Sequence, residues 1–253
     1  MTFETGKRVE RVDLGGVLFQ DLSLRDARFQ RVSFRGARMR GVELGDVTID
    51  GDIEGLVING VEVEPLVYAE LDRRYPDRVK MRPTDPAGFR EGWDVIEQLW
   101  DGTVARARQL PPEQLHESVD GEWSFIQTLR HLLFATDSWI GRGILGDPSP
   151  WHPLALPWDS MEPIPGVPWD RDVRPTLDEV LALRRDRMAT VRRYVENLTE
   201  DELDADTTPV DGPGWPPPES FPVRECLLIV YNEEWQHRLY AERDLDLLES
   251  QHR

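Results

Sequence analysis

The chain has 253 residues, of which 39% are hydrophobic and nine are tryptophan, enough for a real core in one large domain or in a domain with an accessory piece. Its formal net charge of −18 argues against nucleic acid and anionic membranes as partners. A single cysteine, Cys226, excludes an intrachain disulfide framework. Without a bilayer-spanning apolar run or a signal-like start, we expect a cytoplasmic protein with no nucleic-acid or membrane partner.

An apolar residue recurs every five positions near the start of the chain. One series comprises Leu14, Phe19, Leu24, Phe29, Phe34, Met39, Leu44 and Ile49, and a second comprises Val12, Val17, Leu22, Ala27, Val32, Ala37, Val42 and Val47. A period of five fits neither a helix nor a strand, and predicts stacked coils that each bury a large residue against the next. The pattern resembles the pentapeptide-repeat family, which implies a short right-handed β-helix over residues 1–64.

Charge in this segment separates two interpretations of the repeat. Some pentapeptide-repeat proteins mimic DNA through dense surface acid, whereas arginine and acidic residues are nearly balanced here. We therefore favour a small β-solenoid that caps or dimerises the second domain, which allows a homodimer. Residues 65–84 then form a linker with a short helix, and Pro83, Asp85 and Pro86 mark a boundary.

Residues 85–253 read as a four-helix bundle with helix-start signals at four points. Asp85 before Pro86 starts a helix that runs to about Gln109. Capping-box spacing starts further helices at Ser124, ending near Leu145, and at Thr176, ending near Asn197. The last helix runs from Pro222 to about Glu249, and Thr199 caps a short turn before it.

The last helix carries the chain's best candidate for chemistry. Its apolar stripe comprises Val223, Leu227, Val230, Ala241 and Leu245. Glu233 and His237 lie within that stripe, four residues apart, so both side chains cover one patch of helix surface. Burying such groups is costly unless they are paired, and a divalent metal pairs with both.

His131, on a predicted buried helix face, is the best third ligand among five histidines; His116 lies in a polar loop and His252 in the tail. Two histidines and a glutamate with open positions form a catalytic type of site, in which zinc fits best and nickel, iron or manganese are compatible by ligand type. Two alternatives stay open: Glu234 as the carboxylate ligand, or a buried Glu–His pair with no metal.

Two segments, GEWSFIQTLRHLL at 121–133 and NEEWQHRLYAERDL at 232–245, resemble the DinB/YfiT-like superfamily. The resemblance implies a four-helix bundle with a crossover connection and a metal triad of His131, Glu233 and His237. The common pattern has histidine where this chain has Glu233. The Glu-x-x-x-His version resembles the branch that contains mycothiol-dependent maleylpyruvate isomerase and other mycothiol-dependent S-transferases.

That branch implies an enzyme in which the metal activates mycothiol or another low-molecular-weight thiol for S-transfer to, or isomerisation of, a small electrophile. The long Pro/Trp-rich segment from 146 to 175 is either a wall of the pocket or a mere crossover connection. Contacts to thiol or substrate are expected from Arg142, Trp151, His152 and Trp158. The rival functions are a metal-dependent hydrolase on the same site and a non-catalytic binding or stress protein.

Overall fold

The structure, a computed structural model, describes residue 9 and residues 12–250. The chain divides into two compact units, residues 1–52 and 53–253. No helix in these described ranges combines the length and the apolar character that a membrane span requires.

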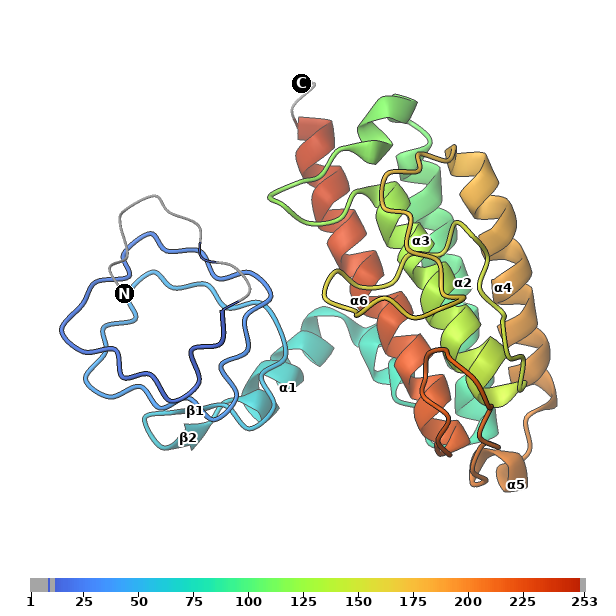
Figure 1. The fold of residues 1–253 in the computed structure, drawn as a ribbon, viewed down its shortest axis with the longest axis horizontal. Coiled ribbons are helices and arrows are strands. Elements are labelled where there is room, and N and C mark those ends of the chain that lie inside the picture. Colours follow the sequence, from blue (N-terminus) through green and yellow to red (C-terminus); the bar gives the residue numbers. More distant parts are fainter. Residues whose placement is uncertain (1–8, 10–11, 251–253) are drawn as a thin grey trace. The chain divides into compact units, whose positions relative to one another are not determined.

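The first unit is a succession of turns spaced five residues apart and not a β-helix (Figure 1). Positive φ angles recur at Gly16, Asp21, Asp26, Arg31, Gly36, Gly41, Asp46 and Gly51. None of the described residues in this unit lies in a strand. The predicted right-handed β-helix over residues 1–64 is therefore wrong, while residues 1–8 and 10–11 of that range lie outside the described residues.

Two observations explain the difference. The amides of Val17, Ala27 and Ala37 donate to carbonyls three residues earlier, so these groups close local turns instead of a ladder between coils. The large apolar side chains stay about half exposed, 48% for Phe34 and 62% for Ile49, instead of being buried between coils. The five-residue period is thus present in the backbone without the β-helix expected from it.

The second unit begins with a small hairpin. Strands β1 (Val57–Ile58) and β2 (Val61–Glu62) pair antiparallel, with Ile58 opposite Val61. Asn59 and Gly60 between them both have positive φ, as a two-residue hairpin turn requires. Helix α1 (Glu64–Arg74) and the 3₁₀ helix η1 (Pro76–Met81) follow, in the range expected to be a linker, and η1 packs against the helices of the bundle.

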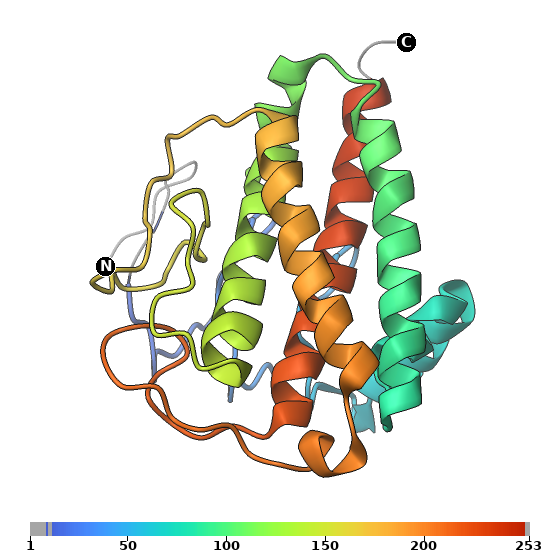
Figure 2. The same ribbon diagram turned by 90° about the vertical axis from the view of Figure 1, so that its right-hand side faces the viewer.

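Four long helices form the bundle, side by side in Figure 2. They are α2 (Pro86–Ala107), α3 (Phe125–Thr136), α4 (Leu177–Asn197) and α6 (Val223–Ser250). Each contacts two neighbours, in the cyclic order α2, α6, α3, α4. The core between them is built from fully buried residues of all four helices, including Phe89, Trp93, Leu129, Leu132, Leu133, Val180, Val191, Leu227, Val230 and Leu245. This is the helical architecture that the sequence predicts for residues 85–253.

Local side-chain bonds set the helix starts. Asp85 accepts from the amide of Gly88 at 2.8 Å at the start of α2. Ser124 and Gln127 form a reciprocal capping box on α3, as Thr176 and Glu179 do on α4. Two short helices lie between these elements, η2 (Pro112–His116) and α5 (Glu200–Leu203).

Helix α3 continues into a π-helix, η3 (Asp137–Ile144). The wider turn is visible in the backbone, where the amide of Leu145 donates to the carbonyl of Ile140, five residues earlier. The sequence predicts one uninterrupted helix from Ser124 to Leu145, so the change of helix type is a correction. The loop 146–175, which follows η3, runs along one side of the bundle, and the loop 204–222 lies at the end where α6 begins (Figure 2).

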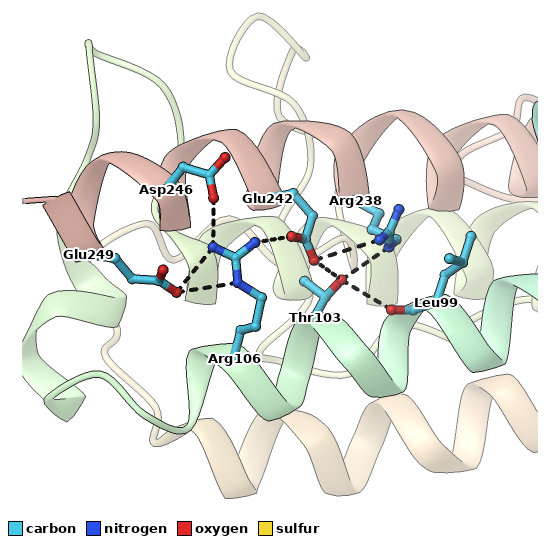
Figure 3. A network of polar contacts seen from close by, with 7 residues as sticks. All are labelled: Leu99, Thr103, Arg106, Arg238, Glu242, Asp246 and Glu249. Atoms are coloured by element: carbon cyan, nitrogen blue, oxygen red, sulfur yellow. Dashed lines mark hydrogen bonds and ion pairs between the residues drawn. The ribbon is translucent and has the colours of Figure 1, made fainter. Parts of the chain in front are cut away.

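A polar network ties α2 to the last turns of α6 (Figure 3). The Arg106 guanidinium donates to Glu242, to Asp246 at 2.7 Å and to Glu249 at 3.0 Å. Thr103, one turn earlier on α2, also donates to Glu242. These bonds fix the register of α6 against α2, and α6 is the helix that carries Glu233 and His237.

Candidate metal centre

The candidate site lies between two neighbouring helices of the bundle. His131 is on α3, and Glu233 and His237 are one turn apart on α6. Because α3 and α6 are in contact, the three side chains meet although a hundred residues separate them in sequence. One ligand atom from each residue lies within 4.8 Å of the others, so the group could hold a metal ion.

One carboxylate oxygen stands between two imidazole nitrogens. Glu233 Oε2 is 3.2 Å from His131 Nε2 and 3.0 Å from His237 Nε2. Without an ion these are hydrogen-bond distances. Small rotations of the three side chains would direct the same atoms at a shared cation, because all three already point to one place.

A backbone carbonyl fixes the orientation of His131. Its Nδ1 lies 2.9 Å from the carbonyl oxygen of Leu156. A carbonyl can only accept, so Nδ1 carries the hydrogen, which leaves Nε2 as the ring atom that faces Glu233 and that would bind an ion. The outer nitrogen of a metal-bound histidine is almost always held in this way. The donor set therefore fits a divalent ion.

Exposure differs across the three side chains: 8% for His131, 18% for His237 and 29% for Glu233. The site is thus reached from the carboxylate side. Burial raises the pKa of Glu233, but hydrogen bonds from His131 and His237 lower it further, so the net pKa lies well below its usual range. Glu233 is therefore a carboxylate at neutral pH and a ligand with one negative charge.

Aromatic rings surround the imidazoles, and the most important one was not predicted from the sequence. The indole of Trp123 lies 4.6 Å from the His131 ring and 5.7 Å from the His237 ring, centroid to centroid. Tyr240 meets His237 edge-on at 5.9 Å. Trp123 directly precedes the N-cap Ser124, a position whose apolar side chain often folds back onto the first turns of its helix. That signal would have placed it near α3.

Arg142 lies in η3, and its side chain contacts the two loops beside it. Its buried guanidinium donates to four backbone carbonyls, those of Pro148, Val210, Gly212 and Pro216. It thereby joins the loops 146–175 and 204–222 to η3.

Trp151 and His152 also make their described contacts around η3. The indole of Trp151 donates to Ser138 of η3 at 3.0 Å, and the backbone amide of His152 donates to Asp137 of η3 at 3.3 Å. The His152 ring accepts from the amide of Leu154 at 3.1 Å. Trp158 lies nearer the triad, edge-on to Phe134, whose ring centroid is 6.2 Å from that of His131. The structure thus brings together His131, Glu233 and His237 with Trp158 one ring further out, and the contacts predicted for Arg142, Trp151, His152 and Trp158 to a ligand stay predictions.

Glu234, the alternative carboxylate, belongs to a different contact. It forms a two-pronged ion pair with Arg184 of α4, at 2.6 and 2.8 Å, with both side chains buried. Successive helix residues point about 100° apart, which explains why the two glutamates serve different neighbours. The geometry therefore selects Glu233 for the triad.

Fold and site together define a class: a four-helix bundle with a crossover connection and a possible metal site between two of its helices. The family model of the DinB superfamily matches residues 96–241, more than half of the chain and a range that contains all three triad residues. The chain belongs to the DinB superfamily, as the sequence motifs predict. Neither the curated proteins nor the solved structures contain a match.

Proposed function

We propose that this protein is a metal-dependent enzyme that activates a low-molecular-weight thiol for transfer to, or isomerisation of, a small electrophile. The observation that carries the proposal is the convergence of His131 Nε2, Glu233 Oε2 and His237 Nε2 from two helices. Zinc fits this mixed nitrogen and oxygen donor set best, and nickel, iron and manganese are compatible with it.

The residues of the triad determine which fourth ligand the site favours. Three protein ligands leave at least one coordination position for an exogenous group. Glu233 brings a single negative charge and the two imidazoles are neutral, so a divalent site keeps one net positive charge and favours an anion. When bound, the metal supplies a Lewis acid that lowers the pKa of a thiol or water in its open position.

A thiol is the preferred nucleophile for two reasons. The Glu-x-x-x-His pair of α6 resembles the branch of the superfamily that uses mycothiol, and the thiolate is the reactive form of a thiol. The rings of Trp123 and Tyr240 also border the imidazoles with apolar surface, which suits a sulfur atom better than a hydroxide.

The reaction balances without any further reagent. In transfer to a conjugated alkene, the sulfur forms a bond to the electrophilic carbon and the thiol proton ends on the neighbouring carbon. In isomerisation, rotation about the former double bond follows, the carbon–sulfur bond breaks, and the same proton is lost. The thiol is then regenerated and only the geometry of the alkene has changed.

Metal analysis of the purified protein tests the first part of the proposal. We expect about one equivalent of a divalent metal in the wild type and its loss in His237→Ala, because two ligands hold an ion far less tightly than three. His116→Ala, which alters a histidine of η2 outside the triad, is the matched control and should retain the metal. A wild-type chain that binds no added zinc, nickel, iron or manganese would contradict a metal enzyme and favour a non-catalytic bundle.

Incubation of the metal-loaded protein with mycothiol and a panel of electrophiles, followed by mass spectrometry, tests the second part. We expect thiol adducts or isomerised product with the wild type and with His116→Ala, and neither with His237→Ala. Metal-dependent hydrolysis of the panel without a thiol adduct would instead favour the hydrolase interpretation of the same site.

A further inference from the structure

Trp123 contacts two of the three candidate ligands at once. Its ring is nearly parallel to that of His237, with an interplanar angle of 15° at 5.7 Å, and inclined by 47° to that of His131 at 4.6 Å. The two imidazoles are themselves 4.8 Å apart. Three aromatic rings from three points of the chain therefore pack as one cluster, in which neither imidazole rotates freely without displacing the indole.

The indole is bonded to the crossover segment rather than to its own helix. Trp123 Nε1 donates to Asp159 Oδ1 at 3.2 Å. Asp159 is paired with Arg171 at 2.6 Å, and the Arg171 guanidinium lies 4.5 Å from the centre of the Trp169 ring. Arg171 also donates to the Trp158 carbonyl at 3.0 Å. The acceptor of the indole is thus paired with Arg171, and Arg171 is in turn held by the Trp169 ring and the Trp158 carbonyl.

The crossover loop 146–175 contacts the site at a second point. Leu156, three residues before Asp159, accepts from His131 Nδ1, and its amide donates to the carbonyl of Arg130 at 3.0 Å. The fully buried Arg130 guanidinium donates to the carbonyls of Leu154 at 2.7 Å and Val173 at 3.3 Å. The crossover therefore supports the centre at two points, one through a backbone carbonyl and one through Trp123.

We propose that Trp123 is a positioning residue of the metal centre, whose indole, anchored to Asp159, sets the ring planes of His131 and His237. The inference rests on the proposed metal site. A ligand ring that is already oriented loses little conformational freedom when it binds an ion, so its affinity is higher and its release slower. Residues that hold the metal ligands in place without binding the ion themselves typically change metal affinity about 10–100-fold when they are removed.

Metal release measures this role directly. Protein loaded with Zn²⁺ or Co²⁺ is mixed with excess chelator, and the rate of release is compared among variants. We expect Trp123→Ala and Asp159→Leu to release metal at least about tenfold faster than wild type. Asp159→Asn, which keeps an acceptor oxygen for the indole, should stay close to wild type. Asp172→Ala removes an exposed carboxylate of the same segment and is the matched control.

A double-mutant cycle tests whether the Trp123–Asp159 bond is the route of the effect. Trp123→Phe keeps a flat ring but lacks the N–H donor, so combining it with Asp159→Leu should add little to either change alone. The visible spectrum of the Co²⁺-loaded variants should differ from wild type, since it reports ligand geometry. The metal-free Asp159→Leu chain should still unfold in one cooperative thermal transition, which shows that it is folded.

Two failures are distinguishable in this experiment. If the wild type takes up no metal, the proposed function itself is wrong. If the wild type holds metal but Trp123→Ala and Asp159→Leu release it at the wild-type rate with an unchanged Co²⁺ spectrum, the metal site stands and the role given to Trp123 is wrong. Additive effects in the cycle would likewise refute the anchoring of the indole by Asp159.

Discussion

At the scale of single residues, the adjacent Glu233 and Glu234 show how one helix serves two purposes. Glu233 faces the imidazoles of His131 and His237 with 29% of its side chain exposed, whereas Glu234 is 1% exposed and paired with Arg184. The first can exchange its partners for an ion. Glu234 is enclosed, so it contributes to stability by neutralising the buried Arg184 guanidinium.

Removing only one partner of the enclosed pair should be costly. We expect Glu234→Ala to lower the free energy of unfolding by about 3–5 kcal/mol, because the Arg184 guanidinium stays buried without a carboxylate. Urea denaturation checks the value. The double variant Arg184→Met with Glu234→Leu is the control and should lose much less, since neither charge remains. A single variant within about 1 kcal/mol of wild type would show that water or another group replaces the carboxylate.

Cys226 gives a prediction about pH. Burial raises the pKa of its thiol from 9.0 to about 11, with a smaller contribution from Glu225. At pH 8 the thiolate fraction is therefore about a hundredfold lower than in an unfolded chain. We expect iodoacetamide to leave native protein unmodified at pH 8 and to label it fully in denaturant, as read by mass spectrometry.

The same shift has a defined sign for stability. Between pH 9 and pH 11 the unfolded thiol has lost its proton and the folded one has not, so the free energy of unfolding contributed by Cys226 falls as pH rises through this range. Below pH 9 the contribution is constant. Cys226→Ala should therefore reduce the fall in the free energy of unfolding between pH 9 and pH 11. In the labelling experiment, rapid modification of the native protein at pH 8 would contradict the buried position of Cys226.

At the scale of elements, α2 contains two glycines with opposite surroundings. A Cβ on Gly92 would come within 2.5 Å of the Lys80 carbonyl oxygen and 2.9 Å of Tyr231 Cε1. A Cβ on Gly102 would meet nothing within 4 Å. Gly92 thus permits the close approach of η1 and α6 to α2. Gly102 lowers the stability of the helix and allows no close packing in exchange.

Alanine at these two positions should change stability in opposite directions. We expect Gly102→Ala to raise the free energy of unfolding by up to about 1 kcal/mol through helix propensity. Gly92→Ala should lower it by about 1–3 kcal/mol, because backbone must move to admit the methyl group. The two variants control each other in thermal or urea unfolding, and equal effects would contradict the packing of η1 on α2.

The helices were predictable where their signals are local. Asp85, Ser124 and Thr176 each accept from an amide three residues on, a contact that spacing alone reveals. The π-helix η3 was not predictable, because Asp137 and Ser138 take their partners Arg187 and Trp151 from outside the helix and no local signal marks the change of helix type. The pair Glu233 and His237 was predictable from its i, i+4 spacing. The place of Trp123 beside α3 had a local signal, but its hydrogen bond to Asp159 depends on a distant loop and had none.

At the scale of the whole molecule, the two units differ in how far a sequence pattern determines structure. In residues 53–253 the apolar stripes of four helices face one another, so pattern and burial agree. In residues 1–52 the period of five is equally regular, but Phe19 and Phe34 each remain 48% exposed. A period specifies where turns recur. It specifies a β-helix only if successive coils also pair their backbones, and that pairing has no signature in residue type.

Metal binding should be visible in the stability of the whole bundle, because the ligands come from α3 and α6 and are together only when the chain is folded. An ion that binds the folded form alone adds about 2.7 kcal/mol at a concentration 100 times its Kd. For a unit of this size that corresponds to a rise in Tm of about 5–10 °C. We expect differential scanning calorimetry to show this rise for wild type and His116→Ala on adding Zn²⁺, and none for His131→Ala or His237→Ala. An equal rise in all four would place the ion elsewhere, whereas a rise confined to the chains with an intact triad would show that one cation joins two helices of the core.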